Sequence, residues 1–285
     1  MTRRSALIQL HIAAVLFGLT GVFGELIQAD ATVITFGRAM FAVLALVGFA
    51  NWQGRTLRAR LSGRTLAVLL ASGALLALHW VTFFVAVKVG GIAVATLGFA
   101  SFPAFTTLLE SLIYRERIRA AEWGVLALVS IGLILVVPSY DWADDGARGL
   151  AWGLASGLSF SLLAVFNRHS AAGMDAVQVA TWQNLAVCVL TAFFAVPQLS
   201  AIAPVDWLWL AALGIFCTGL SHFLFVSGLR LIKARDAGVI IALEPVYAIA
   251  VAWALFAQVP SLRMMFGGLL IIAAIGVASR YKPAH

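Results

Sequence analysis

The sequence predicts an all-helical polytopic membrane protein whose ten transmembrane helices form two inverted five-helix repeats. Of its 285 residues, 62% are hydrophobic and 11% are charged, and the mean hydropathy is +1.01. The apolar residues form continuous runs of about 17 to 23 residues, which suit transmembrane helices. A transmembrane barrel would instead alternate apolar and polar residues along short strands. In lipid, only helices and closed barrels satisfy the backbone polar groups, so these runs predict helices.

The apolar runs place the ten spans along the chain. They lie at residues 5–24, 31–50, 65–87, 92–113, 121–138, 149–167, 176–196, 205–229, 237–258 and 264–279. The connections between them are short, and none contains an inserted soluble domain. The first run follows Arg3 and Arg4, as in a signal peptide, but lacks a small-residue cleavage site. We therefore expect it to be retained as the first helix.

The basic residues predict the orientation. Most of the 19 lysines and arginines lie in alternate connections, beginning with Arg3 and Arg4. The other connections carry only Lys88, Arg148 and Arg263, together with five aspartates. Positive residues stay on the cytoplasmic side. We therefore expect a multi-pass protein of a bacterial-type inner membrane, with both termini in the cytoplasm.

A long segment of the first half recurs in the second. Residues 83–114 and 225–256 align without a gap and share a basic turn and an Ala-rich helix with one proline. The matched pairs are Phe83 with Phe225, Lys88 with Arg230, Ala95 with Ala237, Pro103 with Pro245, Phe105 with Tyr247 and Tyr114 with Phe256. Such internal repeats indicate duplication. We predict one repeat in residues 1–138 and a second in residues 149–285, inverted because each has an odd number of spans.

The ninth span carries a recognisable motif. The run LEPVYAIAVAWALF, at Leu243–Phe256, and the ten-span inverted plan resemble the EamA family of the drug/metabolite transporter (DMT) superfamily. The overall pattern is most similar to YddG-type exporters of amino acids, aromatic ones included. The Gly-Glu pair that often ends these helices in the family is replaced by Arg115-Glu116 and Ala257-Gln258. The resemblance implies an exporter of small metabolites that works by alternating access.

Two charged residues lie deep in predicted spans. A charge at the membrane centre costs about 2.5–3.5 kcal/mol, so Glu244 is expected to face a cavity or a partner. It could bind a substrate ammonium or a proton, or it could make a structural hydrogen bond, with Asn184 at a similar depth. Arg38 could attract a carboxylate, or it could extend to the interface. We do not pair Arg38 with Glu244, since a rise of 1.5 Å per residue separates their depths by about 10 Å.

Aromatic and small residues suggest a cavity wall and hinges. The proposed aromatic wall consists of His79, Trp80, Phe83 and Phe99, with Ser159 and Leu163 opposite. The proposed hinges are Pro103 and Pro245, because proline breaks the helical hydrogen-bond ladder, together with Gly18 on the first span. Tight helix packing and tolerated kinks are the structural alternatives for these residues.

Other functional classes lack their signatures. The net charge is +7, but the basic residues lie in short turns between apolar runs. They therefore predict membrane topology rather than nucleic-acid binding. Cys188 and Cys217 fall within apolar runs, and no metal-ligand spacing or cofactor motif is present. No ATP-binding motif occurs, which disfavours an ATP-driven pump, and no GxSxG or HExxH motif occurs, which disfavours an enzyme. A channel would usually show a repeated pore loop, and none is evident. The expected partners are an amino-acid substrate and the lipid bilayer, with protons as a candidate coupling ion. The alternative is an exporter of cationic or aromatic drugs.

Overall fold

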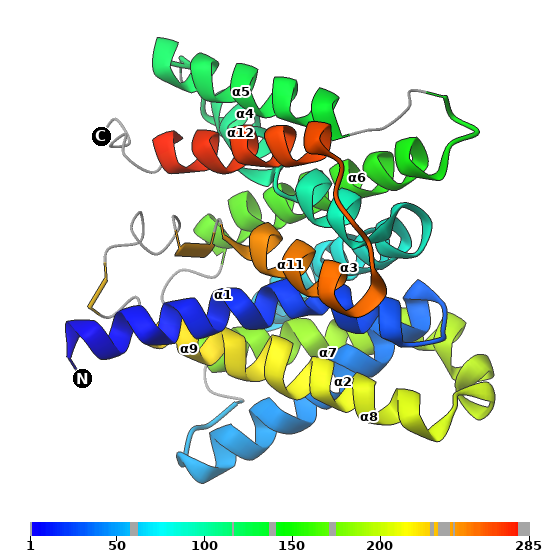
Figure 1. The fold of residues 1–285 in the computed structure, drawn as a ribbon. Coiled ribbons are helices and arrows are strands. Elements are labelled where there is room, and N and C mark those ends of the chain that lie inside the picture. Colours follow the sequence, from blue (N-terminus) through cyan, green and yellow to red (C-terminus); the bar gives the residue numbers. More distant parts are fainter. Residues whose placement is uncertain are drawn as a thin grey trace.

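The computed structural model describes residues 2–57, 62–115, 117–136, 141–170, 175–228, 231–232, 240–241 and 243–278, and helices dominate this part of the chain. Each of the ten predicted spans contains a helix (Figure 1). The helices are α1 (Arg3–Leu26), α2 (Ala31–Trp52), α3 (Gly63–Phe99), α4 (Phe102–Tyr114), α5 (Ala120–Val136), α6 (Asp145–Ser170), α7 (Ala176–Ala195), α8 (Pro204–Gly214), α9 (Ser221–Gly228), α11 (Glu244–Phe256) and α12 (Leu262–Ala278). A 3-10 turn, η1 (Val196–Ala201), follows α7, and a π-helical turn, η2 (Ile215–Leu220), joins α8 to α9.

Several of these helices have the length and composition of membrane spans. Within the described residues, six helical stretches are long and apolar enough to cross a bilayer, and they lie in α1, α2, α3, α6, α7–η1 and α8–α9. The helices α5, α11 and α12 are apolar but shorter. The predicted class, a polytopic helical membrane protein, is therefore confirmed.

The third and fourth predicted spans share one helix, α3, with a sharp kink between them. At the kink, Gly91 has φ 79° and ψ 170°, a backbone conformation that essentially only glycine adopts. The fourth span then breaks again between Phe99 and Phe102, just before Pro103. In the second half, a turn at Leu243 comes just before Pro245 on α11 in the same way. The predicted proline breaks are thus present in both halves.

The backbone repeats at the far end of the same helices. Arg115 ends α4 with φ 56°, and Ala257 ends α11 with φ 54°. These are the only non-glycine residues with positive φ in the described part of the chain. They occupy matching positions when Pro103 is aligned with Pro245. Glycine is the usual residue at such a left-handed helix end, and it is the residue that resemblance to the EamA family leads one to expect here.

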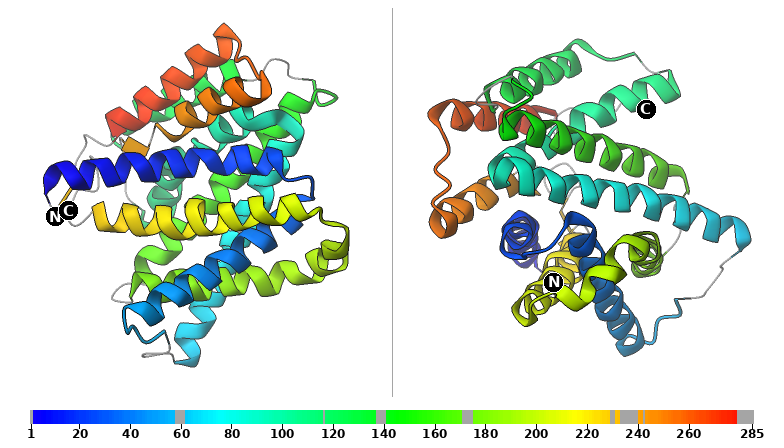
Figure 2. Two further views of the ribbon diagram at one scale, coloured as in Figure 1. Left: turned by 60° about the horizontal axis from the view of Figure 1, so that its bottom comes forward. Right: turned by 90° about the vertical axis from the view of Figure 1, so that its right-hand side faces the viewer.

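The helices pair as expected for two halves of opposite direction. Equivalent helices of the two halves pair with each other, α2 with α7 and α5 with α12, while α1 packs on α9 and α11 much as α6 packs on α3 and α4. Figure 1 shows α5 and α12 running in opposite directions, and α1 begins on the side where α12 ends. The left view of Figure 2 shows α1 beside the helix formed by α8 and α9.

Small residues allow the closest helix contacts. A Cβ atom added to Gly132 of α5 would lie 2.7 Å from the carbonyl oxygen of Gly267 on α12. On α3, a Cβ at Gly90 would lie 2.8 Å from the Cα of Gly149 on α6. Small residues at membrane helix interfaces let backbones approach in this way. The two halves of the chain are therefore in backbone contact.

Candidate functional site

Arg38 of α2 lies inside the bundle. Its side chain is 6% exposed, and its Nε donates a 2.7 Å hydrogen bond to the Thr218 hydroxyl. The guanidinium carbon lies 4.0 Å from the ring centroid of Trp80, within the range of a cation–π interaction. The side chain therefore does not extend to the interface, so that alternative is wrong.

The π-helical turn η2 supplies the partner of Arg38. The Thr218 hydroxyl donates a 3.2 Å hydrogen bond to the Leu213 carbonyl, five residues earlier. Gly214, just before the turn, permits close approach, because a Cβ there would lie 2.6 Å from the carbonyl oxygen of Arg38. π-Helical turns within α-helices occur frequently at functional sites.

Glu244 begins α11, one residue before the proline. Its side chain is partly buried, and no described residue donates a hydrogen bond to its carboxylate. Its carbonyl oxygen would lie 2.8 Å from a Cβ at Gly18 of α1. Gly18 thus packs directly against the start of α11, where the sequence predicts a hinge.

Arg38 and Glu244 form a separated pair of opposite charges. Both side chains lie within predicted spans, and no ion pair joins them within the described residues. The terminal amino groups of Arg38 also make no hydrogen bond to the part of the chain that is described. The Arg38 guanidinium, from the first half of the chain, and the Glu244 carboxylate, from the second half, are therefore each available to a group of opposite charge.

Asn184 does not act as the partner of Glu244. Its side-chain nitrogen donates a 2.8 Å hydrogen bond to the Ala180 carbonyl of its own helix, α7. Its Oδ1 is buried and has no hydrogen-bond partner among the described residues. The predicted contact between Asn184 and Glu244 is therefore absent among the described residues.

His79 is the centre of an aromatic cluster between α3 and α6. Its ring nitrogen Nδ1 lies 2.8 Å from the Ser156 hydroxyl. The imidazole centroid lies 5.0 Å from Phe99 and 4.9 Å from Phe160. Phe99 is also stacked with Phe102 at 5.3 Å. We call His79, Phe83, Phe99, Phe102 and Phe160 the aromatic cluster.

The structure divides the predicted wall. His79, Phe83 and Phe99 do meet, but Trp80 lies against Arg38 instead. The Ser159 hydroxyl donates to backbone carbonyls of its own helix, and Leu163 packs in the core that contains Trp80. The sequence prediction did not include Phe160 and Phe102. The available signal was adjacency in the sequence, because Phe160 follows Ser159 and Phe102 precedes Pro103, and the prediction included both Ser159 and Pro103.

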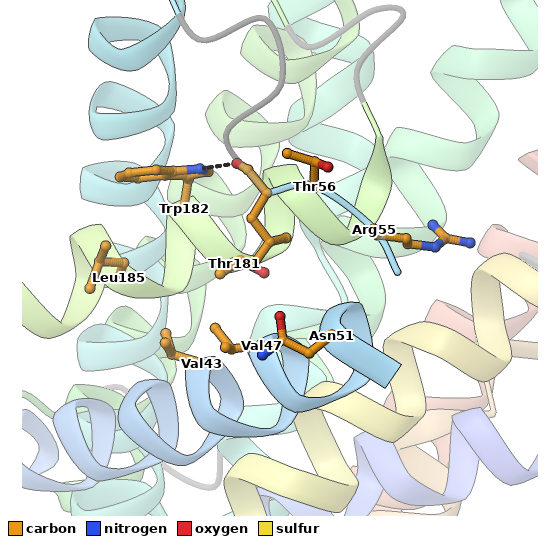
Figure 3. Close-up of a pocket in the computed structure, with 9 residues that line it drawn as sticks. Val43, Val47, Asn51, Arg55, Thr56, Thr181, Trp182 and Leu185 are labelled. Atoms are coloured by element: carbon orange, nitrogen blue, oxygen red, sulfur yellow. Dashed lines mark hydrogen bonds between the residues drawn. The ribbon is translucent and has the colours of Figure 1, made fainter. Parts of the chain in front are cut away.

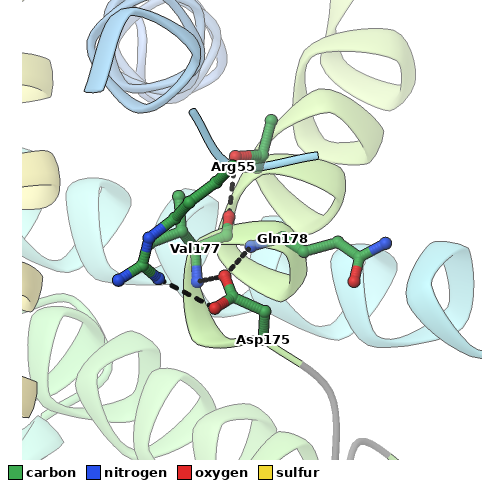
Figure 4. A network of polar contacts seen from close by, with 5 residues as sticks. Arg55, Asp175, Val177 and Gln178 are labelled. Atoms are coloured by element: carbon green, nitrogen blue, oxygen red, sulfur yellow. Dashed lines mark hydrogen bonds and ion pairs between the residues drawn. The ribbon is translucent and has the colours of Figure 1, made fainter. Parts of the chain in front are cut away.

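A polar contact ties the first half of the chain to the second near the end of α2 (Figure 4). This end of α2 lies on the side where α1 begins (Figure 1). Asp175 caps α7 by accepting hydrogen bonds from the backbone N–H groups of Val177 and Gln178. It also forms a 2.8 Å ion pair with Arg55, which follows α2. Trp182 and Gln178 both donate side-chain hydrogen bonds to the Leu57 carbonyl. We call this set the α2–α7 latch.

In the part of the chain that the structure describes, the latch has no equivalent at the other end of the same helix pair. Asp30 occupies the corresponding position before α2, but its side chain makes no capping hydrogen bond. Two residues before Asp30, the Gln28 backbone N–H donates a 3.3 Å hydrogen bond to Asp206 Oδ1. The described part of the α2–α7 pair is therefore fastened at one end only.

No group of three or more His, Cys, Asp or Glu side chains suited to a metal ion occurs in the described residues.

Comparison with known proteins identifies relatives over most of the chain. The signature of the EamA-like transporter family matches residues 4–137 and again residues 147–280. An uncharacterized transporter of Archaeoglobus fulgidus is 26% identical over 272 residues, which cover 94% of each chain. The uncharacterized transporter YxxF of Bacillus subtilis is 23% identical over 282 residues, covering 96% of this chain and 89% of that protein.

Two further comparisons concern export and fold. The pseudopaline exporter CntI of Pseudomonas aeruginosa is 24% identical over 226 residues, or 78% of each chain. A solved crystal structure superposes with a TM-score of 0.68 at 20% identity and covers 97% of this chain and 98% of its own. At this identity the structural match establishes the fold alone.

Proposed function

Because the chain belongs to the EamA-like transporter family, we propose that this membrane transporter exports amino acids, aromatic ones included, or related small metabolites. The observation that carries the proposal is the separated pair of Arg38 and Glu244. An amino acid presents a carboxylate and an ammonium group, which complement a guanidinium and a carboxylate respectively. Buried charges inside a membrane protein mark substrate or ion pathways. The two side chains come from different halves, as a central transporter site requires.

The aromatic cluster favours substrates that have a flat side chain. Phe99, Phe102 and Phe160 are each only partly buried, so their rings retain accessible surface beside the buried His79. Aromatic rings pair in offset or edge-to-face arrangements, which would let the cluster accept a substrate side chain. The cluster lies where the chain breaks before Pro103, so opening this kink would change the space beside the rings.

We further propose a direction and a location. The transporter lies in a bacterial-type inner membrane with both termini in the cytoplasm, because basic residues concentrate in alternate connections. Export is supported by the relative named as a pseudopaline exporter. Cysteine labelling checks this topology: Thr56→Cys should be protected from an impermeant periplasmic reagent, and Ser139→Cys should react. If Thr56→Cys were labelled from the periplasm and Ser139→Cys were protected, the orientation would be the opposite of the one proposed.

Alternating access would move the two repeats, residues 1–138 and 149–285, against each other. Pro103 and Pro245 would act as hinges, and Gly18 would be the pivot contact of α1 on α11. Protons are a candidate coupling ion, with Glu244 as the carrier. Counterflow measured across a pH series would test this coupling, since Glu244→Gln should abolish its pH dependence. An unchanged pH response in that variant would remove Glu244 from proton coupling.

Counterflow in proteoliposomes tests the substrate class. Phenylalanine should exchange, whereas phenethylamine, which lacks the carboxylate, and phenylpropionate, which lacks the amine, should exchange poorly. Glu244→Gln and Arg38→Gln should each reduce phenylalanine exchange per folded molecule, while Asp145→Asn, an exposed control, should not. Efficient exchange of phenethylamine without phenylalanine exchange would instead favour the exporter of cationic drugs.

A further inference from the structure

A pocket of about 560 Å³ opens between α2 and α7 (Figure 3). Its lining residues come from α2, from the segment that follows α2, and from α7: Val43, Val47, Asn51, Arg55, Thr56, Leu57, Thr181, Trp182 and Leu185. Its volume lies within the range of small-molecule sites, about 300–1,000 Å³. None of the residues assigned to the candidate transport site lines it.

The pocket is apolar where α2 and α7 run beside each other and polar where α2 ends and α7 begins. Val43 and Val47 line it from α2, and Leu185 lines it from α7. At 1.5 Å per residue, Val43 lies about 12 Å along the helix from Asn51, near the end of α2. Beside the pocket, Leu44 is 61% exposed and Val189 is 66% exposed. These apolar side chains would face acyl chains in a bilayer, so the pocket adjoins the lipid-facing surface.

The polar end of the pocket offers hydrogen-bond donors. The Asn51 amide and the Thr56 hydroxyl make no side-chain hydrogen bond to the described residues. Arg55 uses Nη1 for its bond to Asp175, which leaves Nε and Nη2 without an acceptor in the described part of the chain. The Trp182 N–H is already bonded to the Leu57 carbonyl, so this indole offers the pocket mainly its apolar surface.

The charge at this end favours an anion. Asp175 is the carboxylate that Arg55 pairs with in the latch, and it also caps α7. The sequence from residue 55 to residue 64 contains four arginines, which leaves the connection positive after that pairing. Clusters of basic residues directly beside a membrane span attract anionic lipid head groups.

We propose that this pocket binds one anionic phospholipid from the leaflet on the side where α1 begins. One acyl chain lies along Val43, Val47 and Leu185, and the phosphate accepts hydrogen bonds from Asn51, Thr56 and Arg55. A transported amino acid fits the pocket less well, because its ammonium group would need a carboxylate that Arg55 does not already occupy. The lipid would also span α2 and α7, which belong to different halves and are joined there by the latch.

Lipid-dependent stability tests the proposal. The purified full-length protein is placed in nanodiscs of dioleoyl phosphatidylcholine with or without dioleoyl phosphatidylglycerol, and its melting temperature and retained lipid are measured. We expect phosphatidylglycerol to raise the melting temperature by several degrees and to be retained through delipidation. Val47→Phe, which fills the pocket, should abolish both effects. Leu44→Phe, one turn away on the exposed face of the same helix, is the matched control and should preserve them.

Three further measurements keep the proposal falsifiable. If Val47→Phe does not fold, Leu185→Phe fills the same pocket from α7. Soluble glycerol phosphate should not reproduce the stabilisation, because it lacks the acyl chain; full stabilisation by it would identify a phosphate site rather than a lipid site and overturn the proposal. Equal melting in both lipids, or an unchanged lipid effect in the pocket-filling variant, would also overturn it. Loss of counterflow in the pocket-filling variant in every lipid would assign the pocket to the substrate path instead.

Discussion

Replacing Gly18 by alanine should loosen the contact between α1 and α11. The new Cβ would lie 2.8 Å from the Glu244 carbonyl oxygen, 3.1 Å from the Ala248 nitrogen and 3.2 Å from the Tyr247 Cβ, whereas ordinary contacts begin at 3.4 Å. Two of the three neighbours are backbone atoms, so no flexible side chain can move aside. The helices must separate by about 0.6 Å, and overpacking of this kind typically costs about 1–3 kcal/mol.

The helical preference of alanine over glycine offsets part of this cost, by about 0.5–1 kcal/mol. We therefore expect Gly18→Ala to lower stability by about 1–2 kcal/mol, which corresponds to a fall of roughly 2–8 °C in melting temperature. Because Glu244 begins the displaced helix, counterflow per folded molecule should fall as well. The assays are thermal melting in detergent and counterflow in liposomes, both on the same preparation.

Gly48→Ala is the matched control. Gly48 lies on α2 and is exposed, and no atom of the described residues lies within 4 Å of an added Cβ. Alanine there should leave counterflow unchanged and melting unchanged or slightly higher. If Gly18→Ala melts as high as Gly48→Ala and transports normally, the close contact between Gly18 and Glu244 is not a constraint and the packing argument is refuted.

Two other predictions concern the helix end and the latch. Ala257→Gly should raise stability by about 1 kcal/mol, because Ala257 has φ 54° and left-handed backbone costs non-glycine residues about 1–2 kcal/mol; Ala254→Gly, inside the same helix, should lower it, and equal melting of the two would contradict this. Asp175→Asn should change stability by less than about 1 kcal/mol, as expected for an exposed ion pair, but should change the counterflow rate, since that pair joins the two halves. Asp145→Asn breaks a pair within a single helix, so a matching rate change in both variants would exclude a role for the latch.

Features that depend on neighbours along the chain were predictable from the sequence. The spans, the proline breaks and the repeat follow from hydropathy and spacing, and the structure places helices and breaks accordingly. The replacement of the family's Gly-Glu pairs already singled out Arg115 and Ala257, the two non-glycine residues with positive φ.

Features that depend on packing between helices were not predictable. His79 and Trp80 are neighbours in sequence, but successive helical residues point in different directions, so one joins the aromatic cluster and the other lies against Arg38. Asn184 was expected near Glu244 because depth was the only coordinate available. Depth leaves the rotation of each helix undetermined, and that rotation decides which side chains meet.

The sequence by itself determined that this chain crosses a membrane repeatedly, because its apolar runs and scattered charges leave no other way to satisfy the backbone. It also determined the internal repeat and the residues that interrupt its helices. Only the tertiary structure decided that Arg38 remains inside, held by Thr218 from a π-helical turn. Only the tertiary structure also showed the latch at one end of the α2–α7 pair and the pocket beside it. These features arise where helices distant in sequence meet, and their geometry is set by helix packing rather than by any local pattern of residues.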